Sequence, residues 1–309
     1  MRRASAILVA TVGLLAGPRL LGGASPAVAA APDAAGGSQL ERLLEEGLAS
    51  LEKGNFTAAA KSFRRADELA KGASHHAHLG LAEAYLKLAD YDRAIKQAER
   101  ALALTEDVGV RARAEGLRGF ALLVRHRYGR YSGPAGQEAR QEDLRRAEQA
   151  WRAVLDLTRG EENIARYHLA DALFAEERYD EAKAGLDEYV AHGGSITATP
   201  EAESLACLLT AGAEGARPAQ DEELTPPVKV RSAVPDIPQQ ARGIRGMVML
   251  RAIIGTAGEV RCVKPIKGLP QGLTEAAVEA VRQWRFTPAT LGGKPVQVFY
   301  SVTIRFESH

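Results

Sequence analysis

The chain of 309 residues is long enough for about two domains of ordinary size. With 46% hydrophobic and 26% charged residues, both domains can bury a core, which excludes wholesale disorder. The formal net charge of +1 hides an asymmetry, because residues 226–309 hold twelve Lys or Arg against five Asp or Glu, whereas residues 30–225 hold 25 against 34. We expect solvated surfaces in both parts. The alternative is a basic tail that docks on the acidic body or on an acidic partner.

The N-terminus has the features of an export signal. Two arginines precede an apolar stretch from Ala4 to Ala16, and residues 27–29 (AVA) form a small-x-small cleavage site. We therefore predict a cleaved signal peptide over residues 1–29, followed by a disordered leader over residues 30–38. The alternative is an uncleaved inner-membrane anchor, although the apolar run ends short of the ~20 residues that a spanning helix needs.

A short motif recurs along the chain at the period of a helical repeat. Residues 54–59 (GNFTAA) and 89–94 (ADYDRA) align at a spacing of 35, and residues 177–182 (ERYDEA) are a further copy. Each copy joins two helical stretches that carry small residues, such as Ala59 and Ala94. Small residues allow two helices to cross closely, and the aromatic residue of the motif fills the gap between successive hairpins. The sequence predicts stacked antiparallel helix pairs with a period of ~34 residues.

An interrupted repeat is expected between the second and the last copy of the motif. Its two helices fall near residues 110–124 and 142–157, and the extra residues form an insertion at 125–141, where turn chemistry argues against a helix. Thr199-Pro200 then begins a helix that caps the array. The predicted array has about four repeats over residues 39–213.

Beyond the array the hydrophobic pattern changes from a helical to an alternating period. Residues 214–226 lack periodicity and are predicted to be a linker. The following domain, residues 227–309, is expected to contain strands at 246–254 and 259–264, an amphipathic helix at 273–284 and a last strand at 296–306. The predicted fold class is therefore α+β with two domains, an all-α solenoid followed by a small antiparallel sheet with one helix.

Residues 39–193 resemble the tetratricopeptide repeat (TPR) family, which implies a solenoid that binds protein partners. Five segments stand in register in the C-terminal part: IPQQA at 237–241, GIRGMV at 243–248, GEV at 258–260, WRFTP at 284–288 and GKPV at 293–296. Through them, residues 235–306 are similar to the C-terminal domain of TonB, which implies an antiparallel sheet backed by a helix and a place in the periplasm of a Gram-negative cell envelope.

The chain differs from TonB itself in the part that precedes the C-terminal domain. It has a repeat array in place of the Pro/Lys-rich spacer of TonB, and its N-terminal segment lacks the His that TonB uses in coupling to ExbB and ExbD. We therefore predict an adaptor that binds proteins. The alternative is a TonB-type energy transducer for outer-membrane transport, anchored by an uncleaved N-terminus.

The resemblance to TonB implies that the last strand offers a free edge to an extended segment of an outer-membrane transporter. We predict a docking edge at residues 298–305, with Val298, Tyr300, Val302 and Ile304 as partner-binding residues. An edge protected by dimerisation or by the repeat array is the alternative. The TPR resemblance implies a concave groove lined by the first helix of each pair. The candidate groove residues are Leu44, Leu48, His76, Glu83, Lys87, Tyr167, Asp171 and Phe174.

The predicted partners are proteins, either an outer-membrane transporter or another envelope complex, or a second copy of the chain through the last strand. Membrane contact is expected only through an uncleaved N-terminus, and export argues against nucleic acid. The basic and aromatic residues at 125–131 are expected to form an exposed loop, and an anionic envelope partner is the alternative.

No catalytic or metal-binding pattern emerges, so we predict no enzymatic activity, no cofactor and no metal site. His75, His76 and His78 precede a helix, without further ligands at a useful spacing. The only cysteines, Cys207 and Cys262, are expected to be buried thiols. A disulfide between them is the alternative, which an oxidising compartment would permit.

Overall fold

The computed structural model of the protein describes residues 34–307, with side chains from Gln39 onward. The predicted signal peptide and the first four residues of the predicted leader lie outside the described residues. Residues 34–38 begin a helix, so the prediction of disorder is wrong for them, because the helical pattern that follows extends back over this segment.

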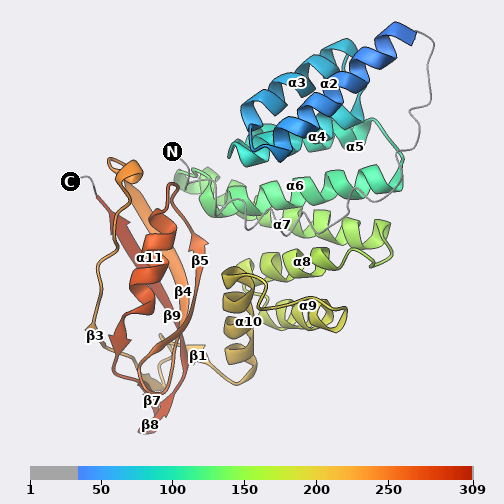
Figure 1. Ribbon diagram of the computed structural model, residues 1–309. Coiled ribbons are helices and arrows are strands. Elements are labelled where there is room, and N and C mark those ends of the chain that lie inside the picture. The colour runs from blue at the N-terminus through green and yellow to red at the C-terminus, as the bar shows by residue number, and fades with distance from the viewer. Residues whose placement is uncertain (1–33, 308–309) are drawn as a thin grey trace. The chain divides into compact units, whose positions relative to one another are not determined.

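The described chain forms two compact units. The repeat unit comprises residues 34–125 and 131–169, and the sheet unit comprises residues 126–130 and 170–307. In the repeat unit the helices form antiparallel pairs that stack on one another (Figure 1). They are α2 (Ala34–Glu52), α3 (Phe56–Leu69), α4 (His75–Lys87), α5 (Tyr91–Ala103), α6 (Val108–Tyr128) as far as Arg125, α7 (Gly133–Leu157) and the first half of α8 (Asn163–Ala175).

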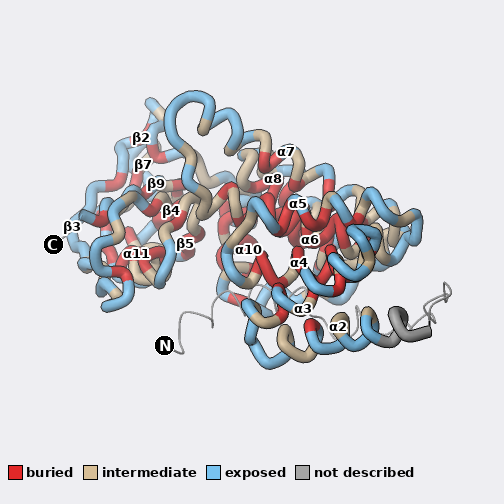
Figure 2. The backbone as a smooth tube through the Cα atoms, turned by 90° about the horizontal axis from the view of Figure 1, so that it is seen from above, coloured by how far each residue is buried: buried red, intermediate tan, exposed pale blue. Residues whose placement is uncertain are grey.

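Phe63 shows why the repeat unit needs small residues where its helices cross. A Cβ atom added to Gly47 of α2 or to Gly80 of α4 would lie 2.5 Å from the Phe63 ring, so the ring occupies the space that both glycines leave. Ala59 and Ala66 on the same helix as Phe63 are fully buried. Figure 2 shows that buried residues gather on the inner faces of these helices. Close approach of three helices around one aromatic ring therefore forms the core of the first repeats.

Polar caps fix where these helices begin. The side-chain oxygen of Asn55 accepts a hydrogen bond from Ala58 N at 3.2 Å, and Ser74 Oγ accepts one from Ala77 N at 3.1 Å. Asp90 accepts one from Arg93 N at 3.2 Å. Each cap pairs a backbone N–H that has no partner inside the helix.

The insertion predicted at residues 125–141 is not a loop, and this prediction is wrong. The extra residues lengthen α6 to 21 residues and α7 to 25, so that only residues 129–132 lie outside a helix. Pro134 stands in the first turn of α7, where proline is compatible with a helix. The Gly and Pro residues mark a helix start here, and the Glu, Arg and Gln residues after them favour its continuation.

The sheet unit is built around a four-stranded sheet with the order β1-β9-β4-β5. The long strands β4 (Gly246–Ile254), β5 (Val260–Lys267) and β9 (Val298–Phe306) are antiparallel, with β4 in the middle. The unit also contains α9 (Tyr179–Ala191), α10 (Pro200–Ala213), α11 (Leu273–Arg282), the 3-10 helix η1 (Gln239–Ala241) and the short strands β1 (Arg217–Pro218), β2 (Leu224–Thr225), β3 (Lys229–Arg231), β6 (Arg285–Phe286), β7 (Ala289–Leu291) and β8 (Lys294–Val296).

Helices cover both faces of this sheet. On one face Leu273 and Val281 of α11 pack on Leu250 and Val263 in the main apolar cluster (Figure 1). Side chains alternate along a strand, so Cys262 points to the opposite face from Val263. Cys262 is bonded there to Cys207 of α10. The helix that the sequence predicted as a cap of the array therefore covers the second face of the sheet.

Residues 214–226 do not form the predicted linker. β1 pairs in parallel with the start of β9, and β2 pairs with β7, so both strands extend the sheets of the C-terminal domain. Two-residue strands show no periodicity of their own, because their hydrogen-bonding partners lie more than sixty residues away in the sequence. The fold class is as predicted, α+β with a helical array and a small antiparallel sheet.

The turn between β4 and β5 depends on a glycine. Gly258 has φ +79°, and a Cβ atom there would lie 1.8 Å from the Phe286 carbonyl oxygen. The Gly258 carbonyl accepts a hydrogen bond from Phe286 N at 2.9 Å. Only glycine allows both this backbone conformation and this close approach. Among the described helices, none is long and apolar enough to cross a bilayer.

Candidate partner-binding site

The outer edge of β9 presents unpaired backbone groups over its second half. On its inner side, β9 pairs with β4 along its whole length, from Val298 to Phe306, without a bulge. On its outer side the Phe299 carbonyl accepts a hydrogen bond from Ala219 N at 2.9 Å. Backbone groups alternate in direction along a strand, so those of Ser301, Thr303 and Arg305 also point outward. Within residues 34–307, no strand pairs with them.

The start of the predicted docking edge is not free, which corrects the prediction for Val298. Arg217 and Pro218 of β1 lie beside Val298 and Phe299 in parallel register. This pairing cannot be recognised in the sequence, because β1 is only two residues long. The open edge therefore runs from Tyr300 to Phe306.

The side chains of the four predicted binding residues on β9 point toward the apolar core of the domain and not toward solvent. Val298 and Val302 are buried in the apolar cluster under α11, and Tyr300 and Ile304 are partly buried against it. The Tyr300 ring packs edge-on against Phe286 with ring centroids 5.0 Å apart. Only the exposed flanks of Tyr300 and Ile304 remain accessible, so the edge offers mainly backbone groups to a partner.

The opposite face of β9 is closed at one end and open at the other. Phe299 is buried there, and its ring stacks on Tyr179 with centroids 5.5 Å apart. Ser301, Thr303 and Arg305 on the same face are exposed. Met247 lies directly opposite Arg305 on β4 and is 36% exposed. An added strand would meet small polar side chains first and then an arginine.

A hollow adjoins the end of β9. Its apolar lining comes from Ile237, Ile244, Leu273 and Phe306, together with Ala241 of η1. The polar residues that line it are Asp236, Arg242 and Glu307. Because Phe306 belongs both to β9 and to the hollow, the two features form one continuous surface.

A buried ion cluster on the second face of the sheet overturns part of the predicted groove. Lys264 Nζ lies 2.9 Å from Asp171 Oδ1, and Arg127 Nη2 lies 3.1 Å from Asp171 Oδ2. Asp171 and Phe174 of α8 are both buried, so the prediction that they line an open groove is wrong. Helical periodicity places residues on a face but does not tell what covers that face.

The charges in this cluster depend on one another. Burial by itself would raise the pKa of Asp171, but the Lys264 and Arg127 cations outweigh it and hold the pKa below its usual range. Burial lowers the pKa of Lys264, and Asp171 offsets part of that effect. Removal of either partner therefore leaves a charge in a site that water scarcely reaches.

The remaining groove candidates differ in their exposure. Leu48 and His76 are accessible to solvent, and Leu44 is partly buried. Two partly buried residues on α4 carry charge: Glu83 is paired with Arg113 at 2.9 Å, and Lys87 has a pKa lowered by burial. Tyr167 is buried, so its prediction as a groove residue is also wrong.

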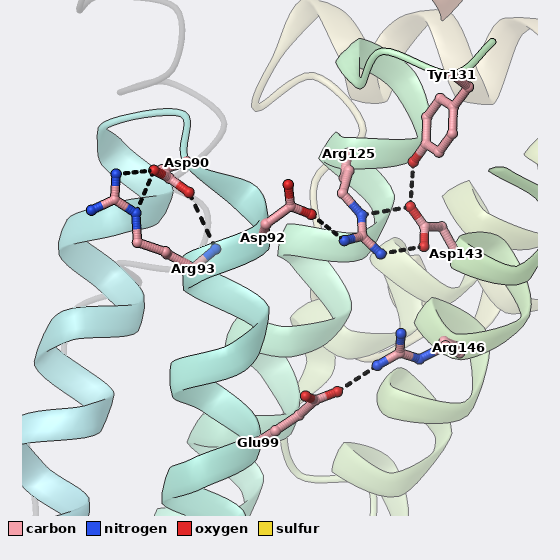
Figure 3. A network of polar contacts seen from close by, with 8 residues as sticks. All are labelled: Asp90, Asp92, Arg93, Glu99, Arg125, Tyr131, Asp143 and Arg146. Atoms are coloured by element: carbon pink, nitrogen blue, oxygen red, sulfur yellow. Dashed lines mark hydrogen bonds and ion pairs between the residues drawn. The ribbon is translucent and has the colours of Figure 1, made fainter. Parts of the chain in front are cut away.

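The predicted basic and aromatic loop at 125–131 is held within the fold. Arg125 of α6 donates two hydrogen bonds to Asp143 of α7, at 2.8 and 2.6 Å, and one to Asp92 of α5 (Figure 3). Tyr131 also donates to Asp143. Burial and the Asp143 carboxylate raise the pKa of Tyr131. Three helices thus meet at one guanidinium, and Arg125 and Tyr131 serve the fold of the repeat unit.

His78 and the two cysteines have structural roles. His78 is buried, with Nδ1 2.7 Å from Gln97 Oε1 and Nε2 3.2 Å from Asp67 Oδ1. Cys207 and Cys262 form a disulfide, so the expectation of two buried thiols is wrong. Their separation of 55 residues in the sequence concealed the contact, which arises because α10 lies on the sheet.

These features define a class of protein, namely a helical repeat array joined to a small α+β domain with an open strand edge. Residues 236–308 match the family model described as Gram-negative bacterial TonB protein C-terminal. Two tetratricopeptide repeat models match residues 50–117 and 138–195. The predicted architecture is therefore confirmed, and the chain combines TPR repeats with a TonB C-terminal domain. Both are in general modules of protein–protein interaction without enzymatic activity.

Three solved structures are similar to part of the chain. MamA protein matches with 16% identity and a TM-score of 0.45, over 58% of this chain and 84% of that one. A thermophilic TPR protein of Thermus thermophilus matches with 19% identity and a TM-score of 0.43, over 57% and 83%. The pilF protein of Pseudomonas aeruginosa matches with 19% identity and a TM-score of 0.35, over 58% and 86%. No curated protein matches the sequence significantly.

Proposed function

We propose that the protein is a periplasmic adaptor of the Gram-negative cell envelope, which docks an extended segment of an outer-membrane partner by strand addition to β9. The carrying observation is the row of outward backbone groups at Ser301, Thr303 and Arg305. Three N–H donors and three carbonyl acceptors in an edge strand are a template for a further strand. A match to the TonB C-terminal model supports an envelope location.

The repeat unit supplies a second, independent binding surface in this proposal. Leu48 and His76 are accessible, and Glu83 and Lys87 are accessible in part, on the first helices of the first two repeats. These residues offer apolar and charged groups to a peptide or a helix of another protein. The adaptor would then hold two envelope proteins together through its two units.

Thr303→Pro tests strand addition with little disturbance of the sheet. The Thr303 N–H points outward and takes no part in pairing with β4, so proline removes a donor only from the open edge. A photoreactive residue at Ser301 reports what lies beside the edge in intact cells. Thr303→Val is the matched control, because it retains the N–H and the strand propensity.

The expected result is an adduct between Ser301 and a contiguous segment of an outer-membrane protein, retained in Thr303→Val. Thr303→Pro should reduce its yield about tenfold or more, because the edge loses a hydrogen bond and gains a bulky ring. Urea unfolding followed by tryptophan fluorescence checks that both variants are folded. Adducts only between copies of the chain, or a yield that Thr303→Pro leaves unchanged, would contradict the proposal.

A further inference from the structure

A segment of the sheet unit, residues 228–238, runs as a strap along helix α11 and is held near both ends of that helix. Beside the C-terminal end, the Ala233 carbonyl accepts a hydrogen bond from Trp284 Nε1 at 3.0 Å. Beside the N-terminal end, a Cβ atom added to Gly272, the N-cap residue of α11, would lie 3.1 Å from Pro238 Cγ. The strap includes β3, which lies on the side of the unit away from α10 (Figure 1 and Figure 2). One side of the strap therefore faces the unit and the other faces outward.

The outer side of the strap is apolar. Lys229 turns inward, with Nζ 4.1 Å from the centroid of the Trp284 ring, so its two neighbours in the chain turn outward. Val234, further along, is 88% exposed. The strap exposes four aliphatic side chains in all: Val228, Val230, Val234 and Ile237. Such a concentration of exposed apolar side chains within ten residues marks a contact surface.

Basic side chains accompany these aliphatic ones. Residues 226–245 hold four basic residues against one acidic residue, Asp236, a net charge of +3. The four basic residues are all exposed: Lys229, Arg231, Arg242 and Arg245. Within residues 34–307, the structure shows no ion pair for the three arginines. The strap and its surroundings therefore attract an anionic surface and at the same time offer it apolar groups.

This combination favours a lipid surface over a protein. Aliphatic side chains beside basic ones are typical of segments that lie in the interface of a membrane. Protein interfaces depend mainly on Trp, Tyr and Arg side chains that enter pockets, and valine is under-represented among their anchors. A second copy of the chain is also disfavoured. Antiparallel pairing of two β3 strands about Val230 would place Lys229 opposite Arg231 of the copy, and like charges in that position repel.

We infer that the strap docks the sheet unit on an anionic lipid surface, with its exposed aliphatic side chains in the headgroup region and Arg231, Arg242 and Arg245 against lipid phosphates. This contact goes beyond the proposed strand addition and does not rest on it, because it uses side chains of the strap and not backbone groups of β9. It also needs no part of the N-terminal segment. The adaptor would then bind a membrane surface as well as proteins.

Sedimentation with lipid vesicles at about 0.1 M salt tests this inference. Vesicles of phosphatidylcholine are compared with vesicles that contain about one third phosphatidylglycerol, which is anionic. The chain from residue 30 onward is used, because it keeps every described residue and lacks the apolar stretch of residues 4–16, which could bind lipid by itself. Wild type should bind the anionic vesicles at least about tenfold more tightly than the neutral ones, since each cation contributes about fivefold.

The basic residues are tested by the double variant Arg231→Gln with Arg242→Gln. It should weaken binding to the anionic vesicles about ten- to thirtyfold. The matched control is Lys53→Gln with Lys61→Gln, which removes two exposed charges from the repeat unit. The control should bind within about twofold of wild type, because charges far from the lipid surface are screened by salt.

The aliphatic residues are tested by the double variant Val230→Ser with Val234→Ser. It keeps every charge and should weaken binding about five- to tenfold, because less apolar surface is buried in the headgroup region. The matched control is Val190→Ser with Ile196→Ser, which changes two exposed aliphatic residues outside the strap. Thermal unfolding of each variant shows that the fold is retained.

Equal binding of wild type to the two kinds of vesicle would overturn the inference, and so would a strap variant that binds as tightly as its control. Absence of binding to either vesicle overturns it as well. Velocity sedimentation without lipid then shows whether the strap joins two copies of the chain, in which case Val230→Ser with Val234→Ser would dissociate the dimer.

Discussion

The buried pair of Lys264 and Asp171 predicts opposite results for single and double substitution. The two side chains are 2% and 6% exposed, and their charged atoms lie 2.9 Å apart. At an effective dielectric constant of about 20, this distance corresponds to roughly 6 kcal/mol of attraction, most of which offsets the cost of burying the charges. Lys264→Met leaves Asp171 with Arg127 as its cation and should lower the unfolding free energy of the sheet unit by about 3 to 5 kcal/mol.

The double variant, Lys264→Met with Asp171→Leu, removes both buried charges and should recover at least about 2 kcal/mol of that loss. Arg127 loses its ion pair with Asp171 as well, but its long side chain is 12% exposed and can turn toward water. Urea unfolding followed by tryptophan fluorescence measures these differences. In a Trp151→Phe background, Trp284 is the only tryptophan, and it reports on the sheet unit.

The exposed pair of Lys183 and Asp187 on α9 provides a matched control in the same unit. Its side chains are 29% and 62% exposed, so Asp187→Asn should change the unfolding free energy by about 0.5 kcal/mol or less. The reasoning is refuted if Lys264→Met costs less than about 1 kcal/mol. It is also refuted if the double variant is as unstable as the single one.

Two further predictions concern the cross-link and the arginine that joins three helices. Replacement of Cys207 and Cys262 by serine should lower the unfolding free energy of the sheet unit by up to roughly 4 kcal/mol, because the disulfide closes a loop of 55 residues and so limits the entropy of the unfolded chain. In the same urea assay, a reducing agent should destabilise the wild type by the same amount. Arg125→Ala leaves Asp143, a buried carboxylate, without its cation. This variant should destabilise the repeat unit by about 3 kcal/mol, measured by unfolding in a Trp284→Phe background, where Trp151 is the only tryptophan. Arg93→Ala, which removes an exposed pair, should cost less than about 1 kcal/mol, and equal losses for the two variants would argue against the role of burial.

Local patterns in the sequence determined the repeats and the main strands. Spacing of the Phe56, Tyr91 and Tyr179 motifs located the helix pairs, because each repeat folds on contacts within itself and with its neighbours. Alternation of apolar residues located β4 with its observed bounds, and all of β9, whose start was predicted two residues too early. Thr199 indicated a helix start because its hydroxyl can accept a hydrogen bond from the backbone N–H of Ala202, three residues later.

The insertion shows where local patterns fail. The same Gly-Pro chemistry at residues 133–134 marks either a turn or the first turn of a helix, and the choice depends on what the following helix can pack against. Asp143 and Trp151 are buried within the repeat unit, and burial of that face favours a long α7.

The sequence by itself therefore determined which modules the chain contains and that the last strand is an edge candidate. Only the tertiary structure decided which part of that edge is open and which charges are buried. β1 covers Val298, Lys264 meets Asp171, and Cys262 meets Cys207 because segments far apart in the sequence pack together. Local sequence patterns cannot predict such contacts, because the contacts are stabilised by burial of surface between elements that are distant in the sequence.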